Sequence, residues 1–427
     1  MDFETEWLLV LPLFFALGWL AAQWDSRKRA QESKKLPKSY FQGLNHLLDQ
    51  EPDKAIEALI DVTRMDTGTV DLHFALGNLF CQRGEVERGI RVYQNLIDRP
   101  DLSEAPRLSA TFKLGMAFLS GGLFDRAEQC FIGLIGTSRE VEARQQLVHI
   151  YQSQQEWQQA ISMTQALKDA SESNVNQANA SQSNSSHASD KQNTHILNLS
   201  LSLAHFHCEL ASEAMRRKDW TAAQIEIQAA LSERPNSIRA QALQGQWYAE
   251  QARHSEALAA WKDLAHRQGD ATPLLVNDMM ASYVALERAT DGVEYLYQQA
   301  LDTGSIDVLE AWLSAQNQYG DSAQSYSRLD ALFTRHPSLN ALNQLLNARI
   351  KEEDAGSEGE RSKAALIRGL IQKQVKQLSR YRCTQCGFEA AHYYWQCPAC
   401  TRWETYPPKR LEEIEQTKRT RDNPNNY

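Results

Sequence analysis

The sequence lacks the short motifs that mark the common catalytic and nucleotide-binding sites. Its 427 residues contain no G-x-G-x-x-G, no Walker loop, no G-x-S-x-G and no H-E-x-x-H. Aspartate and glutamate are abundant, but they are spread through segments with helical periodicity, where carboxylates mostly face solvent. We therefore expect that the protein is not an enzyme.

The sequence also lacks an excess of positive charge. Its 45 lysines and arginines are outnumbered by 54 aspartates and glutamates, which gives a formal net charge of −9. Because nucleic-acid-binding domains are usually basic, and no basic domain stands out, this balance argues against nucleic acid as a partner. A chain of this length is too long to fold around one core, so we expect more than one domain.

Cysteine is scarce, and most of it is concentrated near the C-terminus. Four of the seven cysteines form two C-x2-C pairs, with ten residues between the pairs. Each pair lets two thiolates of one tight turn face the same ion, and two such turns supply the four sulfurs of a tetrahedral site. Thiolates suit zinc as well as iron, so the spacing predicts a metal without identifying it. The candidate ligands are Cys383, Cys386, Cys397 and Cys400.

An uncharged segment near the N-terminus is long enough to cross a membrane. Residues 7–24 read WLLVLPLFFALGWLAAQW and would span about 27 Å as a helix, close to the thickness of a bilayer core. A cleaved signal peptide is the alternative, but the residues before the run are acidic and no clean cleavage site follows. We therefore predict a retained transmembrane helix at 7–24, with residues 1–6 as a short tail.

The charges that follow the apolar run predict its orientation. The linker 25–39 carries six lysines and arginines against two acidic residues. The positive-inside rule keeps such a linker on the cytoplasmic side, so residues 1–6 face the periplasm and the bulk of the chain faces the cytoplasm. Disulfides are not expected in that compartment. We expect Cys81, Cys130 and Cys208, which lie in apolar helical patterns, to be buried and inert.

The middle of the chain is helical and repeats itself. Gly77, Gly115, Val148, Ala211 and Gly245 hold the same place in successive copies, 33 to 38 residues apart where copies adjoin. Small residues there let two helices of one repeat approach closely, while large residues fill the gap to the next repeat. The pattern resembles the tetratricopeptide repeat and predicts an all-α solenoid over residues 40–350. A solenoid of another helical family is the alternative.

Polar segments and a short helix separate these parts. Residues 169–194 are almost all serine, asparagine, glutamine, alanine and aspartate, so we predict a disordered insert within the repeats. An amphipathic pattern over 361–380 predicts a helix that leads into the cysteine module at 381–408. The charged end of the chain, 411–427, is predicted to be a flexible tail.

The order of these parts, together with the motifs of the cysteine module, resembles the lipopolysaccharide assembly protein B family. The motifs are Tyr381-Arg382-Cys383, Cys386-Gly387-Phe388, Tyr394-Trp395 and Cys397-Pro398-x-Cys400-x2-Trp403. The resemblance implies a rubredoxin-like module that binds one iron through Cys383, Cys386, Cys397 and Cys400, with zinc as the alternative. The spacing of ten residues is far shorter than in full-length rubredoxins, and Thr401 stands where a rubredoxin usually has glycine. Both departures favour a structural role over electron transfer.

The same resemblance implies a function. The family consists of inner-membrane proteins that control lipopolysaccharide synthesis and promote degradation of the lipid A pathway deacetylase by the membrane-bound protease FtsH. An inner-membrane protein that senses lipopolysaccharide opposes them. We therefore expect an adaptor or scaffold that also helps to coordinate the proteins of lipopolysaccharide synthesis. The alternatives are a rubredoxin-type electron-transfer protein and a membrane-anchored tetratricopeptide co-chaperone for another assembly system.

Aromatic residues of the cysteine module predict that it docks on the repeats. Tyr393, Tyr394, Trp395 and Trp403 are too many large side chains for a module of this size to bury alone. The apolar face of the preceding helix also needs a partner. We expect docking on the last repeats or on the inner curve of the array, with a flexible tail as the alternative.

Overall fold

A computed structural model describes residues 70–180, 186–352 and 369–422, together with the isolated residues 19, 45, 46 and 54. The chain divides into two compact units, Met1–Ile150 and Tyr151–Tyr427, and each is described by itself. The predicted tail 1–6 and linker 25–39 lie outside the described residues, as does all of the predicted transmembrane segment except Trp19. Of residues 40–69 of the predicted solenoid, only 45, 46 and 54 are described. None of the described helices is both long and apolar enough to cross a membrane.

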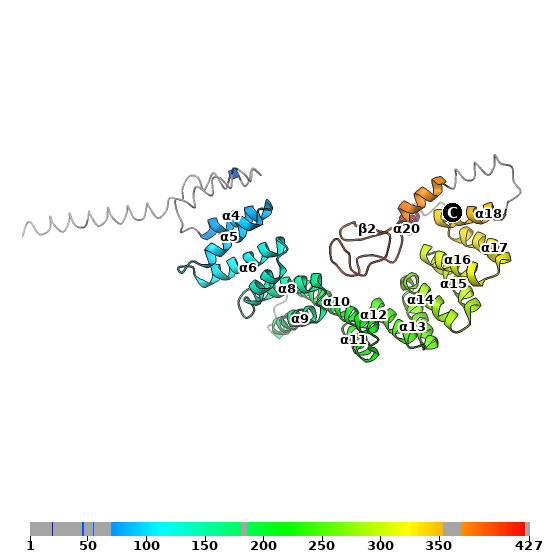
Figure 1. Ribbon diagram of the computed structural model, residues 1–427, viewed down its shortest axis with the longest axis horizontal. Helices are drawn as coiled ribbons and strands as arrows, with labels where there is room; N and C mark the ends of the chain where they lie inside the picture. The colour runs from blue at the N-terminus through cyan, green and yellow to red at the C-terminus, as the bar shows by residue number, and fades with distance from the viewer. Residues whose placement is uncertain are drawn as a thin grey trace, which may run out of the picture. The chain divides into compact units, whose positions relative to one another are not determined.

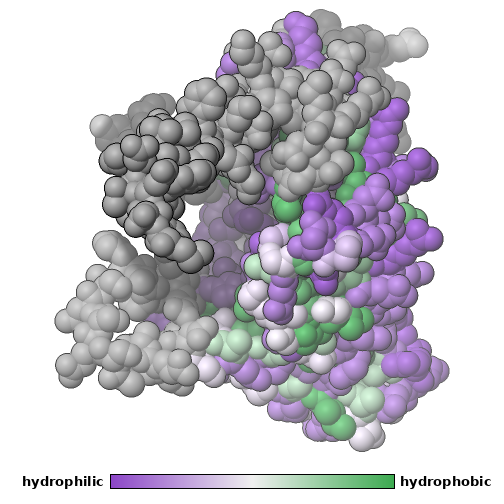
Figure 2. Space-filling model, turned by 90° about the vertical axis from the view of Figure 1, so that its left-hand side faces the viewer, coloured by the Kyte–Doolittle hydropathy of each residue, from purple (hydrophilic) through white to green (hydrophobic). Residues whose placement is uncertain are grey.

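The first unit is a run of helices packed in chain order. Glycines at the predicted positions let neighbouring helices approach closely: a Cβ added at Gly77 would lie 2.6 Å from Tyr93 Cζ, and one at Gly115 would lie 2.8 Å from the Phe131 ring. On the face shown in Figure 2, hydrophobic side chains lie among hydrophilic ones along the described helices. The helices are α4 (Val70–Gln82), α5 (Val86–Ile97), α6 (Glu104–Ser120), α7 (Phe124–Ile132) and α8 (Glu140–Gln154), the last of which ends in the second unit.

The second unit continues the same architecture and curves round an inner face (Figure 1). Gly245 repeats the close approach, because a Cβ there would lie 2.1 Å from Nε1 of the buried Trp261. The predicted all-α tetratricopeptide solenoid is thus confirmed for the described residues. Its elements are α9 (Trp157–Ala180), α10 (Ser186–Arg216), α11 (Trp220–Glu233), α12 (Ile238–Glu250), α13 (His254–Arg267), the 3-10 turn η2 (Gly269–Ala271), α14 (Thr272–Ala285), α15 (Ala289–Thr303), α16 (Ile306–Tyr319), α17 (Ser322–Arg335) and α18 (Leu339–Glu352).

Several turns between helices place one residue in the left-handed backbone region. Gly84 and Gly122 have positive φ values of 79° and 71° in the turns α4–α5 and α6–α7. In later repeats the same left-handed conformation is held by Gln155 (61°), Lys218 (61°), Ala252 (60°) and Glu287 (58°), none of which is a glycine. The later repeats therefore have the same turn geometry as the earlier ones, although no glycine marks these turns in the sequence.

The predicted insert, 169–194, differs from expectation. Its described residues are helical, because α9 continues to Ala180 and α10 begins at Ser186. The insert contains neither proline nor glycine, so nothing in it breaks a helix that begins in the amphipathic flanks. The prediction of disorder rested on the low apolar content of 169–194, and low apolar content alone does not end a helix.

The C-terminal part forms a small module framed by helices. Residues 369–378 are helical, in agreement with that part of the predicted helix 361–380, and residues 361–368 lie outside the described residues. The strands β1 (Tyr381–Arg382) and β2 (Glu389–Ala390) pair antiparallel, and α20 (Leu411–Asp422) follows the module. The flexible tail predicted at 411–427 is replaced by this helix up to Asp422, because Leu411 and Glu412 are buried against the repeats. Residues 423–427 lie outside the described residues.

Candidate metal centre

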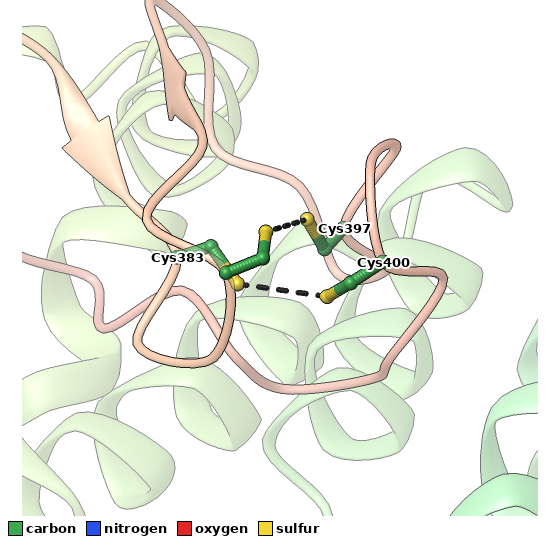
Figure 3. Close-up of side chains that lie close together, drawn as sticks. Cys383, Cys397 and Cys400 are labelled. Carbon is green, nitrogen blue, oxygen red and sulfur yellow. Dashed lines mark hydrogen bonds between the residues drawn. The ribbon is translucent and has the colours of Figure 1, made fainter. Parts of the chain in front are cut away.

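The two cysteine turns face each other across the module (Figure 3). All four sulfurs lie within 4.8 Å of one another. The Sγ atoms of Cys383 and Cys400 are 3.8 Å apart, and those of Cys386 and Cys397 are 3.6 Å apart. Four thiolates at ordinary zinc or iron bond lengths stand roughly 3.8 Å apart round a tetrahedral ion, so the sulfurs are already placed for one. The structure brings together all four residues that the spacing predicted.

Backbone amides support the sulfurs in both turns. Gly387 has a φ of +76°, which allows the chain to curl back after Cys386, and its N–H donates to the Cys383 carbonyl. Burial disfavours the Cys383 thiolate, but hydrogen bonds from Thr405 and from the N–H groups of Cys386 and Gln385 lower the pKa of this thiol to about 6. A thiol that ionises this readily is suited to bind a cation.

The second turn is built in the same way. Burial again disfavours the thiolate, and N–H groups of Cys400 and Ala399 lower the pKa of Cys397 below its usual range. The pKa of Cys386 is raised to about 12: the Phe388 N–H favours its thiolate, but burial and the neighbouring sulfurs outweigh that effect. Four thiolates repel one another unless a cation lies between them, so this donor set fits a metal ion. The site is of the four-cysteine metal-binding type.

A buried ring stack joins the module to α10. Trp403 lies parallel to His205 on α10, with ring centroids 4.5 Å apart and an interplanar angle of 9°. Trp157 and Phe206 contact the same indole edge to face, at 6.5 Å and 6.1 Å. Both Trp403 and His205 are almost wholly buried. The module therefore contributes one of the large side chains of the repeat core.

Glu404 fixes the orientation of this stack. Its carboxylate lies 3.2 Å from His205 Nε2 and accepts a hydrogen bond of 2.8 Å from Arg234. Burial lowers the pKa of His205, although Glu404 opposes the change, and this favours the neutral ring. Burial alone would raise the pKa of Glu404, but His205 and Arg234 hold it below its usual range. The neutral tautomer with its proton on Nε2 donates to Glu404 and leaves Nδ1 to face Arg239 at 3.5 Å.

Arg239 on α12 connects the module with the repeats a second time. Its guanidinium lies over the indoles of Trp395 and Trp403, 5.9 Å and 5.6 Å from the ring centroids. It also donates to Glu209 on α10 at 2.8 Å. The contacts of this cation with two aromatic faces and a carboxylate offset the free energy that it loses when water is removed. As predicted, the module docks on the inner face of the repeats (Figure 1).

The other end of the module is attached to the last repeats. Tyr381 donates to Asp307 at 2.6 Å, and Arg410 Nε donates to the same carboxylate at 3.0 Å. Glu413 accepts from the Ile306 N–H at 2.8 Å, at the start of α16, and Glu412 accepts from the Leu339 N–H at the start of α18. Two carboxylates of α20 thus cap the N-termini of two repeat helices.

Sequence analysis did not single out the residues that hold the module in place. His205, Arg239, Asp307, Glu404 and Glu413 come from four distant segments, and each looks like an ordinary helix or loop residue in the sequence. Of the three cysteines outside the site, Cys208 is buried as expected, and burial raises the pKa of its thiol to about 12. Cys81 and Cys130, which were also expected to be buried, are only half-buried.

Taken together, the fold and the site define a tetratricopeptide-type solenoid with a rubredoxin-like four-cysteine module docked on it. Residues 381–408 match the family described as a rubredoxin metal binding domain. Lipopolysaccharide assembly protein B of Escherichia coli (strain K12) is 31% identical over 409 residues, which cover 94% of this chain and 97% of that protein. The protein of that name from Haemophilus influenzae is 26% identical, with 95% and 98% covered. The chain belongs to the lipopolysaccharide assembly protein B family.

Solved structures with a similar course are more distant. A tetratricopeptide repeat protein from Parabacteroides merdae has 12% identity and a TM-score of 0.31, with 66% of this chain and all of that one covered. The assembly chaperone of RpL4, Acl4, has 12% identity and a TM-score of 0.36, with 61% and 99% covered.

Proposed function

We propose that this protein is an inner-membrane adaptor that regulates lipopolysaccharide synthesis. The observation that carries the proposal is the 31% identity with Escherichia coli lipopolysaccharide assembly protein B over 94% of the chain, cysteine module included. The name of that relative connects it with lipopolysaccharide assembly. A solenoid suits an adaptor because it offers a long curved surface to other proteins.

The proposed partners are the protease FtsH, the lipid A pathway deacetylase and an inner-membrane protein that senses lipopolysaccharide. In this scheme the repeats bind the deacetylase or the protease and bring them together, so the adaptor itself performs no chemistry. A transmembrane helix at 7–24 would keep the repeats on the cytoplasmic side, close to a protease embedded in the same membrane.

Iron is the proposed metal, and its proposed role is structural. When bound, the ion would neutralise the four thiolates and tie the two turns together. The side chains that dock the module, Trp395, Trp403 and Glu404, lie within seven positions of Cys397. Their placement depends on these turns, so metal binding would stabilise the surface that the module shares with the repeats.

The test measures the half-life of the deacetylase in cells depleted of the endogenous relative. Full-length protein should restore rapid turnover when FtsH is present and have no effect when FtsH is absent. A chain without residues 1–26 should fail to restore turnover despite equal abundance. Restoration by the truncated chain would contradict the need for an anchor, and an unchanged half-life with the full chain would contradict the proposal.

A further inference from the structure

A groove runs along α12 on the inner face of the second unit, between α10 and α14. It consists of two adjoining cavities of about 630 Å³ and about 320 Å³. Gln246 lines both, so the two cavities adjoin at this side chain. We call the two adjoining cavities the α12 groove. None of the four cysteines lines it, but Arg239 and Trp395, which dock the module, form part of its wall.

One end of the α12 groove has aliphatic and aromatic side chains among polar ones and is walled by the cysteine module. Leu243 and Leu274 come from the repeats, and Tyr393 and Trp395 come from the module. Arg239 also lines this end, but its guanidinium is already engaged by Glu209 and by the indoles of the module. This end therefore offers an aliphatic and aromatic pocket whose one cation is neutralised.

The other end of the α12 groove is acidic. Glu250 at the end of α12 and Asp278 on α14 line it, and no lysine or arginine is among its lining residues. Asp278 accepts a hydrogen bond of 2.7 Å from the Gln246 amide. The described residues show no ion pair for Glu250 or Asp278. His254 also lines this end and is hydrogen-bonded to Ser282. Two carboxylates in a hollow without a lysine or arginine favour a ligand that brings a cation.

The groups between the two ends are those that an extended peptide needs. Gln246 lies between the two ends, and its side-chain oxygen can accept from a main-chain N–H, while its amide N–H donates to Asp278. Ser212 also lines the groove, and its hydroxyl, which donates to the Cys208 carbonyl, can still accept. A helical ligand has already paired those main-chain groups internally. From Ala242 to Glu250 the groove floor is roughly 12 Å long, a distance that about four residues of extended chain cover.

We propose that the α12 groove binds an extended peptide segment of a partner protein, with an aliphatic side chain against Trp395 and Leu274 and a basic side chain about four residues away at Glu250 and Asp278. The proposal deepens the adaptor function and rests on it, because it specifies the chemistry by which the adaptor recognises a client. The module supplies one wall of the groove through Tyr393 and Trp395, and these residues lie in the same loop as Cys397.

The test uses the purified full chain in detergent and fluorescein-labelled nonapeptides of glycine and serine. One peptide carries leucine and, four positions later, lysine. Two matched peptides replace lysine by glutamate or leucine by serine. By fluorescence anisotropy, the leucine–lysine peptide should bind at least about tenfold more tightly than either of the others.

Variants then test which end of the groove binds the lysine and which end binds the leucine of the peptide. Glu250→Lys should abolish or reverse the preference for lysine over glutamate. Asp330→Lys, an equal change of charge at an exposed site on α17, should leave the preference intact. Leu274→Ala should weaken binding of the leucine–lysine peptide severalfold without changing the lysine-to-glutamate ratio.

Three outcomes would overturn the groove proposal: absence of binding, equal binding of the lysine and glutamate peptides, or the same effect from Glu250→Lys and Asp330→Lys. These outcomes are separable from failure of the adaptor function. If the peptides fail but the chain still restores deacetylase turnover in cells, the adaptor stands and the client binds elsewhere. If the peptides bind as expected but turnover is not restored, the groove stands and the proposed pathway is wrong.

Discussion

At the residue scale, Trp403 is a central contact between the cysteine module and the repeats. Its indole is buried between His205, Trp157 and Phe206. Trp403→Ala would leave a cavity in the repeat core, and we expect it to lower the free energy of unfolding by about 3 kcal/mol or more. Tyr394→Ala is the control, since Tyr394 is 41% exposed. Equal effects of the two changes in denaturant titrations would show that the stack is not part of the core.

The arrangement of the four sulfurs predicts the metal content of the purified protein. Cys383→Ser removes the thiol whose pKa is lowered most strongly, and we expect the purified variant to lose its metal. Elemental analysis should give about one iron or zinc ion per unaltered chain and well under half of that for the variant. Cys81→Ser changes a cysteine outside the site and should leave the metal content unchanged. A full complement of metal in Cys383→Ser would rule out the four-sulfur site.

The raised pKa of Glu413 predicts how the stability of the protein depends on pH. Burial raises the pKa of this carboxyl to about 7, and the Asp307 carboxylate adds to the rise, although the Ile306 N–H and Arg410 favour the ionised form. Between pH 4.5 and 7 the folded chain therefore holds a proton that the unfolded chain has released, so stability falls as pH rises through that window. The loss attributable to Glu413 should be on the order of 2 kcal/mol between pH 5 and pH 8.

The comparison variant for this prediction is Glu413→Gln, which keeps an acceptor for the Ile306 N–H but does not titrate. Its stability should fall less than that of the unaltered chain over the same pH range. Glu415→Gln, at an exposed position of α20, should behave like the unaltered chain. Identical pH profiles for all three proteins would assign the pH dependence to other groups.

At the scale of elements, the turns between repeat helices carry stored strain. Ala252 holds a φ of 60° in the turn between α12 and α13, a conformation that disfavours any residue with a Cβ. Ala252→Gly should therefore stabilise the protein by about 0.5–1 kcal/mol, measured as a higher melting temperature. Ala249→Gly, in the last turn of the same helix, should destabilise it by a similar amount. A lower melting temperature for Ala252→Gly would mean that the turn is unstrained.

The elements that sequence analysis predicted well are those with a strong local signal. Gly77, Gly115 and Gly245 each face a large ring, so the spacing of small and large residues reports the packing directly. Helices with little apolar content were missed, because α9 and α10 continue into polar sequence and α20 looks like a charged tail. Their helical state depends on neighbouring structure, and in α20 on the capping of α16 and α18.

At the scale of the whole molecule, the topology is the next quantity to measure. The basic linker after residue 24 predicts that the repeats and the C-terminus face the cytoplasm. An alkaline phosphatase domain fused after Tyr427 should be inactive, and a green fluorescent protein domain fused there should fluoresce. Replacing the six basic residues of 25–39 by glutamine should reduce this bias. Phosphatase activity in the unaltered fusion would reverse the predicted orientation.

The arrangement of the cysteine module on the repeats could be predicted only in part from the sequence. The spacing of Cys383, Cys386, Cys397 and Cys400 predicted their convergence, since the two turns lie close together in the chain. The surface on which the module rests depends on pairs such as His205 with Glu404, which are 199 residues apart. Such pairs have no local pattern, and only the folded chain brings them together.

The caps supplied by α20 also impose an order on biosynthesis. Glu412 and Glu413 leave the ribosome after every repeat and after all four cysteines, yet they complete the N-termini of α16 and α18. During translation the Ile306 and Leu339 N–H groups therefore lack these acceptors until residues 412 and 413 have been added. A nascent chain interrupted between Cys400 and Glu412 would hold its metal ligands and every repeat, but α16 and α18 would lack these caps. Such a product would be exposed to cellular quality control at its unfinished end.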